Sequence, residues 1–507
     1  MDTKILLVQL QDTPDWEPLA CETLAGAVVQ FCSGCHTDIC VVNPNLNNLD
    51  DFKRKIASTH YDIIGVSVPH GMRPALDSVF ECMDSSDSCR NAMRIIGGHL
   101  PTALPETFLA KYPDIIIVAG WGEDALIKIV NNYKSDDLNL AEIPNIVFTD
   151  HGRIVATKVI ANAAAGVPLR LPSDINLATI ETSRGCYWSE CTFCVRPPNL
   201  RKWRRLDIGS TMNQICGLKA NGVTYFSFAD EDFIGNDIGD AIAFANELKK
   251  IDGISFSMTT RVDNIKSPKD TEYQAMQRNL LLDTLIDAGL ERVVVGCESL
   301  SNTQLKRYNK GIDIDAIKSS VRVLEEKKLK IELGFILFDP LLTTHELREN
   351  ICNLTSTGFW KYSSVFLNEM RVHHGTKLKD MADKSGVLGE MDSNFASYKW
   401  KCKDPQVESV RQNCKIWLHQ TKRLYQLVRN LGRTKRCEIF AEEYCNRLRK
   451  LSLDFLIAAS SGNDASKDMR DRKSCFLNEL QNEITRQKIP TSQTMELILA
   501  EIKMLGK

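Results

Sequence analysis

The chain is 507 residues long, which is enough for two or three domains that each bury a hydrophobic core. Its formal net charge of −2 and its pI near 6.5 give no electrostatic case for binding nucleic acid or an acidic membrane surface. No run of 18 apolar residues is present, which excludes an ordinary transmembrane helix. Seventeen cysteines without a recognisable secretory signal indicate a reducing compartment, and we expect a soluble cytoplasmic protein.

Residues 1–150 alternate short Ile- and Val-rich runs with helical stretches. We expect a helix over Leu19–Phe31 and strands at Ile5–Val8, Asp38–Val42, Ile63–Val68, Arg94–Gly97 and Ile115–Ala119. This alternation predicts a doubly wound, flavodoxin-like parallel sheet covered by helices on both faces. Ligands of such folds bind at the carboxyl ends of the strands. The loops at those ends contain Ser67, Gly97, Gly98, Thr102, Gly122 and Glu123.

A group of cysteines follows the first predicted helix. Cys32, Cys35 and Cys40, with His36, have spacings that a zinc or iron–sulfur site can use. The alternative is that these small side chains pack where the helix turns back to the sheet.

Three cysteines stand within nine residues after a short apolar strand. Cys186, Cys191 and Cys194 have the spacing C-x4-C-x2-C, and a loop can bend three thiolates toward one point. A structural zinc site usually needs four Cys or His ligands, and disulfides need pairs. Three cysteines can instead hold a [4Fe–4S] cluster with one iron open to a substrate or cofactor, because an electron-transfer cluster normally has four. A zinc site or an incidental cysteine cluster stays the alternative.

A second series of alternating strands and helices begins at residue 177. We expect six strands, at 177–182, Tyr225–Ala229, Ser255–Thr259, Arg292–Gly296, Ile331–Phe335 and Val365–Asn368. In parallel barrels the chemistry lies at the carboxyl ends of the strands. Asp230, Arg261, Glu298 and Ser299 follow predicted strands directly. For the acidic residues and the serine the alternative is a helix N-cap.

Beyond about residue 380 the pattern becomes helical. Asp404–Pro405 is typical of a helix start, and Gly432 of its end. Further helices are expected over 435–460 and 474–503, joined by a polar linker at 460–473. We expect these helices to cap the barrel mouth and to determine substrate choice.

The cysteine loop resembles the cluster-binding loop of the radical S-adenosylmethionine (SAM) superfamily. The usual spacing there is C-x3-C-x2-C with an aromatic residue before the last cysteine; Phe193 fits, whereas the first interval is one residue longer here. The six strands match the partial (β/α)6 barrel of that superfamily.

The N-terminal series resembles the cobalamin-binding domain that precedes the barrel in one branch of the superfamily. The segments Gly97-Gly98-x-x-x-Thr102 and Gly120-Trp121-Gly122-Glu123 carry this resemblance. The D-x-H-x-x-G motif of mutases is absent, which implies a cobalamin without a lower histidine ligand from that motif. A domain that has lost its ligand stays the alternative.

The resemblance implies four segments and a set of site residues. The segments are a Rossmann-like cobalamin-binding domain at 1–150, a connector at 151–176, a radical SAM barrel at 177–380 and a helical cap at 381–507. Cys186, Cys191 and Cys194 would bind a [4Fe–4S] cluster, and Phe193 would lie against the SAM adenine. Asp230, Arg261, Glu298 and Ser299 would line SAM; Ser67, Gly97, Gly98, Thr102, Gly122 and Glu123 would line cobalamin. The basic run 196–205 would clamp an anionic substrate or the cobalamin phosphate, unless it is a solvated face.

The reaction that the resemblance implies is methylation of an unactivated carbon in a small-molecule or peptide natural product. It would use a 5′-deoxyadenosyl radical and methylcobalamin, with electrons from a donor such as flavodoxin or ferredoxin. A rearrangement, ring formation or oxidation on the same architecture stays open, as does a non-enzymatic iron–sulfur or zinc protein. No nucleic-acid or membrane partner is expected.

Overall fold

The computed structural model describes residues 2–12, 17–44, 49–135, 138–160, 176–363, 365–432, 438–462 and 466–486. The chain divides into two compact units. The first contains residues 1–293, 371–380 and 389–399; the second contains 294–370, 381–388 and 400–507. Each unit is described by itself below.

The N-terminal part of the first unit is a seven-stranded sheet with the order β2-β1-β3-β4-β5-β6-β7. The first five strands run parallel, as predicted, whereas β6 pairs antiparallel with β5, and β7 pairs antiparallel with β6. A turn at His151–Gly152 joins β6 to β7, so part of the predicted connector is a strand; residues 161–175 lie outside the described ranges. The strands are β1 (Thr3–Leu10), β2 (Cys35–Val42), β3 (Ile63–Ser67), β4 (Met93–Gly97), β5 (Ile116–Val118), β6 (Ile146–Asp150) and β7 (Arg153–Ala156).

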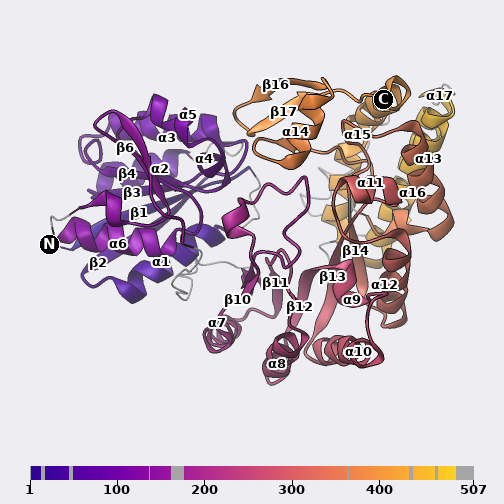
Figure 1. Ribbon diagram of the computed structural model, residues 1–507, viewed down its shortest axis with the longest axis horizontal. Helices are drawn as coiled ribbons and strands as arrows, with labels where there is room; N and C mark the ends of the chain where they lie inside the picture. Colours follow the sequence, from indigo (N-terminus) through magenta and orange to yellow (C-terminus); the bar gives the residue numbers. More distant parts are fainter. Residues whose placement is uncertain are drawn as a thin grey trace. The chain divides into compact units, whose positions relative to one another are not determined.

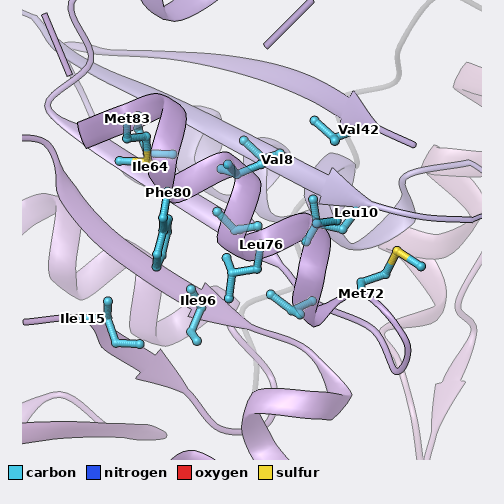
Figure 2. Packing of buried hydrophobic residues seen from close by; sticks show 14 of the residues in the cluster. Val8, Leu10, Val42, Ile64, Met72, Leu76, Phe80, Met83, Ile96 and Ile115 are labelled. Atoms are coloured by element: carbon cyan, nitrogen blue, oxygen red, sulfur yellow. The ribbon is translucent and has the colours of Figure 1, made fainter. Parts of the chain in front are cut away.

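Helices cover both faces of this sheet, because successive strand residues point to opposite sides. Leu6 and Val8 belong to one buried cluster, whereas Ile5 and Leu7 belong to the other. The first cluster packs against α2 (Leu49–Ser58), α3 (Arg73–Asp84), α4 (His99–Ala103) and α5 (Pro105–Lys111); the second packs against α1 (Leu19–Phe31) and α6 (Glu123–Lys134). Figure 2 shows Leu76, Phe80 and Met83 of α3 in the first cluster.

The cysteines after α1 divide between these two cores. Cys40 lies in the first cluster and Cys32 in the second, on opposite faces of the sheet, while Cys35 packs partly against the second. Burial raises the pKa of both Cys32 and Cys40 to about 11. The packing interpretation is therefore confirmed for Cys32 and Cys40, since thiols on opposite faces cannot share one metal ion.

The second sheet contains five strands in the order β14-β13-β12-β11-β8. The predicted sixth strand, Val365–Asn368, is wrong for the residues that the structure describes. Two successive N–H groups, of Leu337 and Phe338, donate to the single carbonyl of Asn368, and only an isolated bridge, Phe338 to Glu369, forms. The strands are β8 (Leu177–Ile180), β11 (Tyr225–Phe228), β12 (Ser255–Arg261), β13 (Leu290–Glu298) and β14 (Lys330–Phe335).

Helices follow the strands of this sheet in the alternation expected of a radical SAM barrel (Figure 1). They are α7 (Ile208–Ala220), α8 (Ile238–Leu248), α9 (Val262–Ile265), α10 (Glu272–Asp287), α11 (Asn302–Arg307), α12 (Ile314–Glu326) and α13 (Thr344–Thr357). The α/β fold class predicted from the sequence is confirmed.

Two small antiparallel sheets were not predicted. One pairs β9 (Ser183–Arg184) with β10 (Arg204–Arg205). The other has the order β15-β17-β16, and α14 (Lys377–Lys384) lies between β15 and β16 in the chain. Its strands are β15 (Val372–His373), β16 (Leu388–Asp392) and β17 (Ser397–Trp400).

The C-terminal region of the second unit is helical, as predicted. It contains α15 (Pro405–Gly432), α16 (Glu438–Ser460) and α17 (Ser466–Arg486). Asp404 starts α15 by accepting a hydrogen bond from the N–H of Gln406 at 2.9 Å. The polar linker predicted at 460–473 is mostly helix, and residues beyond 486 lie outside the described part. In the described residues no helix is both long and apolar enough to cross a membrane.

Candidate cofactor cavity and cysteine loop

A cavity of about 530 Å³ lies within the first unit, at the carboxyl ends of the N-terminal strands. All six residues predicted to line cobalamin border it, namely Ser67, Gly97, Gly98, Thr102, Gly122 and Glu123. Cys194 of the cysteine loop borders the same cavity. The strand ends and the cysteine loop therefore border the same cavity.

Glycines at the strand ends bring the walls of the cavity together. Gly98 has φ +100°, and a Cβ placed on it would lie 2.9 Å from the carbonyl oxygen of Val68. Gly120 has φ +124°, and its Cβ would lie 3.0 Å from Cδ1 of Leu200. A larger residue at Gly98 would clash with the backbone of Val68, whereas one at Gly120 would displace the Leu200 side chain, and both would strain the backbone.

The residues present fit a large, flat ligand such as a corrin. Backbone and apolar side chains form much of the wall, and a few polar groups stand among them, as in most cofactor sites. The Thr102 hydroxyl donates to the carbonyl of Gly98 at 2.8 Å and keeps its own oxygen as an acceptor. The apolar lining includes Leu19, Leu24, Val118, Leu126 and Leu200.

One buried arginine connects the cavity wall to the strand that leads to the cysteine loop. Arg184 forms ion pairs with Glu123, and with Glu181 at 2.7 Å. Burial lowers the pKa of Arg184, but the two carboxylates outweigh that effect and raise it. Two guanidinium groups contact the ring of Trp121, with the Cζ of Arg184 at 5.3 Å and the Cζ of Arg204 at 4.1 Å from the ring centroid. These contacts tie the loop after β5 to β9 and β10.

The cysteine loop leaves β9 through Gly185, whose φ is +81°. A Cβ there would lie 2.6 Å or less from the carbonyl oxygens of Arg201 and Lys202, so the close approach requires glycine. Cys191 is buried, Cys186 and Cys194 are partly exposed, and none of the three is part of a disulfide. The N–H of Cys194 donates to the carbonyl of Cys191 at 3.3 Å, which forms a tight turn between them.

The donor set of this loop fits an open [4Fe–4S] cluster chemically, because three cysteines outside any disulfide stand on one loop and one of them borders the cavity. Within the described ranges no three His, Cys, Asp or Glu side chains form a group that could hold a metal ion. The three cysteines thus share a loop without converging to ligand geometry.

Two of the residues predicted at SAM brace the cysteine loop. Asp230 accepts hydrogen bonds from the backbone N–H groups of Thr182 and Ser183. Arg261 pairs with Asp263 at 2.9 Å and lies under the rings of Tyr187 and Trp188, at 5.2 and 5.1 Å. Phe193 lies partly buried on the loop itself. Contact of these residues with SAM stays a prediction.

Glu298 and Ser299 belong to the second unit. Ser299 is fully buried, and its hydroxyl donates to Gln304 at 2.6 Å. Glu298 has φ +68°, unusual for a residue with a side chain, and pairs with Lys310 at 3.1 Å. A strained backbone at the end of a barrel strand is typical of a functional position, and SAM binding by these residues stays a prediction.

The basic run 196–205 is not a solvated face. Arg196 pairs with Glu231, and Arg205 pairs with Asp240 at 2.9 Å. Arg201 donates to backbone carbonyls of the cysteine loop, while Lys202 is exposed. The expected phosphate clamp stays a prediction for Arg196, which borders the cavity.

Sequence reasoning missed Arg184, Trp121 and the use of Arg201. Gly122, Glu123 and the basic run were expected to contribute to the site, but no local pattern indicates which carbonyl or carboxylate an arginine will meet. The sequence does place a tryptophan between two glycines, and it contains a basic run at 196–205. Together, these two features were the one available sign that an aromatic ring contacts arginines.

Two family profiles match the chain. The B12 binding domain matches residues 7–130 and the Radical SAM superfamily matches residues 180–351. Among curated proteins, the chain is 30% identical over 334 residues to 4'-phospho-dehydrooxetanocin synthase of Priestia megaterium, covering 60% of this chain and 44% of that protein. It is 28% identical over 269 residues to anaerobic magnesium-protoporphyrin IX monomethyl ester cyclase of Cereibacter sphaeroides, covering 49% and 42%. The chain thus matches less than half the length of these two relatives.

Solved structures show the same fold. The cobalamin-dependent SAM radical enzyme OxsB, with aqua-cobalamin and SAM bound, has a TM-score of 0.84 at 21% identity, covering 100% of this chain and 84% of that one. The radical SAM methyltransferase TsrM from Kitasatospora setae has a TM-score of 0.62 at 16% identity, covering 76% and 78%.

Proposed function

The chain combines a B12-binding domain with a radical SAM domain, and from this premise we propose that it is a cobalamin-dependent radical SAM enzyme acting on a small molecule. One observation carries the proposal. The strand ends of the B12-binding domain and Cys194 of the cysteine loop border the same cavity. Two cofactors that share one cavity can act on one substrate, and the cavity walls limit the access of water to reactive species.

The chain's own residues would hold the cofactors and exclude water. Cys186, Cys191 and Cys194 would bind a [4Fe–4S] cluster, and the glycine-lined strand ends would hold cobalamin. When bound, the cluster with SAM supplies a carbon-centred radical, and cobalamin supplies a carrier for a methyl group or an electron. Trp121 and Leu200 would close the cavity wall between the two cofactor sites.

The first candidate reaction is methyl transfer to carbon, as expected from the sequence. It is supported by the similarity to TsrM and by 27% identity over 222 residues to bacteriochlorophyllide d C-8(2)-methyltransferase of Chlorobaculum tepidum. A rearrangement or ring-forming reaction without methyl transfer is the second candidate. The 30% identity to a synthase and the 28% identity to a cyclase favour it. An electron donor such as flavodoxin or ferredoxin is part of either proposal.

SAM turnover by anaerobically reconstituted protein tests the enzyme class. Under reduction we expect SAM to be cleaved to 5′-deoxyadenosine, and substitution of Cys186, Cys191 and Cys194 by Ala to abolish both the cluster and the cleavage. Cys216→Ala, which removes an exposed thiol of α7, is the matched control and should retain both. Cleavage by the triple variant would refute the assignment.

SAM with a deuterated methyl group separates the two reactions. With cobalamin present, methyl transfer predicts S-adenosylhomocysteine and a corrinoid heavier by the labelled methyl, even before the substrate is known. Formation of 5′-deoxyadenosine without S-adenosylhomocysteine would decide for the second candidate.

A further inference from the structure

Arg201 lies at the point where the two ends of the cysteine loop meet. Its backbone carbonyl accepts a hydrogen bond from the N–H of Cys186 at 2.9 Å. Its guanidinium donates to the carbonyl of Cys194 at 2.8 Å through Nη2. One residue therefore contacts the backbone of both the first and the third cysteine.

The same guanidinium reaches two more carbonyls of the loop region. Nη1 donates to the carbonyl of Ser189 at 3.2 Å, and Nε donates to the carbonyl of Arg196. Ser189 has φ +48°, a left-handed conformation that a residue with a side chain seldom adopts without support. A planar guanidinium is the side chain that can satisfy three carbonyls arranged around one plane.

Two other contacts hold single points of the loop. Glu231 accepts from the N–H of Gly185 at 2.9 Å, and the N–H of Leu378 donates to the carbonyl of Thr192 at 2.9 Å. Each of these contacts fixes one point, whereas Arg201 joins two cysteines.

We propose that Arg201 is a positioning residue for the [4Fe–4S] cluster: it fixes the backbone of Cys186 and Cys194 and places a positive charge beside the cluster. The inference rests on the proposed function, because it presumes that the three cysteines hold that cluster. Outer partners of this kind orient the ligands of a metal site and tune its electronics. A nearby positive charge favours the reduced, more negative state of the cluster.

Two variants of Arg201 separate the effect of its side-chain hydrogen bonds from the effect of its positive charge. Arg201→Met loses the three hydrogen bonds and the charge, so we expect roughly tenfold weaker retention of the cluster against a chelator. We also expect the reduction midpoint of the remaining cluster to move to a more negative potential. Arg201→Lys keeps the charge without the planar fork. It should lose cluster retention but keep a midpoint close to that of the wild type.

Lys202→Met is the matched control, because Lys202 is exposed and carries the same charge one residue further on. Iron content, chelator-driven iron loss and the potential-dependent electron paramagnetic resonance signal are the readouts, with far-UV circular dichroism to verify folding. Wild-type retention and midpoint in a folded Arg201→Met protein would overturn the inference. An equal midpoint shift in Lys202→Met would also overturn it, since the charge effect would then be nonspecific. Failure of the wild type itself to build a [4Fe–4S] cluster would instead refute the proposed function.

Discussion

Asp230 is a buried carboxylate that accepts hydrogen bonds from neighbouring parts of the chain. Oδ1 accepts from the N–H groups of Thr182 at 2.8 Å and Ser183 at 2.7 Å, and Oδ2 accepts from the Thr182 hydroxyl at 2.7 Å. Burial raises the pKa of Asp230 from 3.8 to about 6, although these hydrogen bonds oppose the shift. The carboxylate fixes the chain between β8 and β9, from which the cysteine loop departs.

The raised pKa predicts how Asp230→Asn responds to pH. Because the folded state raises the pKa of the carboxyl, its contribution to stability is complete below pH 3.8 and is lost as the pH rises through about 6. A shift of this size corresponds to roughly 3 kcal/mol, since each unit is about 1.4 kcal/mol. Asparagine keeps an oxygen for the two backbone donors and removes the charge. We therefore expect the stability of Asp230→Asn relative to the wild type to rise as the pH increases from about 4 to about 6, and to change little above that.

Thermal melting of the cluster-free protein at several pH values measures this difference. Asp230→Ala serves as the comparison, because it loses every acceptor and should melt below the wild type throughout the range. If the difference in melting temperature between the wild type and Asp230→Asn does not change with pH, the buried carboxyl does not titrate in this range.

Among the elements, those set by local burial were predicted closely. Helix α1 begins at Leu19 and ends at Phe31 as expected, because its small apolar residues, such as Ala25 and Val28, pack on the sheet. Strands β1 and β3 were found within one or two residues of their ends, since continuous apolar runs mark strands buried on both faces.

Elements set by distant contacts were missed. The turn between β16 and β17 is held by the carbonyl of Asn394, which accepts from the N–H of Gly71 at 2.7 Å, more than 300 residues away. Most residues of β16 are exposed, so its sequence lacks the alternation of apolar and polar residues that predicts a strand. The candidate site shows a similar division. The glycines and Thr102 could be predicted because they follow strand ends in the sequence. The partners of Arg184 and Arg201 could not, because only folding brings them together.

The strand ends make a prediction about Gly98. A methyl group there would meet the backbone of Val68, with oxygen at 2.9 Å and nitrogen at 3.1 Å, rather than project only into the cavity. We expect Gly98→Ala to strain the junction of β3 and β4 and to weaken cobalamin binding. The loss of unfolding free energy should be about 2–3 kcal/mol, combining left-handed strain with the clash.

Gly152→Ala is the control that measures the cost of the left-handed backbone conformation alone. Gly152 has φ +75° and nothing within 4 Å of an added Cβ, so it carries the left-handed strain without the clash. It should cost about 1 kcal/mol and leave cobalamin binding unchanged. Denaturant unfolding and cobalamin titration provide the two readouts. Equal losses in both variants would contradict the clash with Val68.

At the scale of the whole molecule, the matched B12-binding region at 7–130 and the radical SAM region at 180–351 contribute to one cavity. From the first come Ser67, Gly98 and Thr102; from the second come Arg184 and Cys194. A ligand that fills the space between them therefore covers a thiol that belongs to the other domain.

That shared cavity predicts protection of Cys194 by cobalamin. In protein without a cluster, Cys194 is a partly exposed free thiol at the cavity wall, whereas Cys216 is an exposed thiol of α7 that does not border it. We expect hydroxocobalamin to slow alkylation of Cys194 by iodoacetamide about tenfold or more at saturation, because a buried ligand excludes the reagent from most of the wall it contacts. The rate at Cys216 should not change.

Mass spectrometry of peptides sampled over time measures both rates in the same reaction. Gly98→Ala supplies a second control, since weaker binding should restore alkylation of Cys194 at the same cobalamin concentration. Slowing at both thiols would indicate a general effect of the corrinoid on the reagent. Cobalamin that binds tightly while Cys194 reacts at its original rate would place the corrinoid outside the cavity, and the cysteine loop would then have to meet its substrate without the second cofactor beside it.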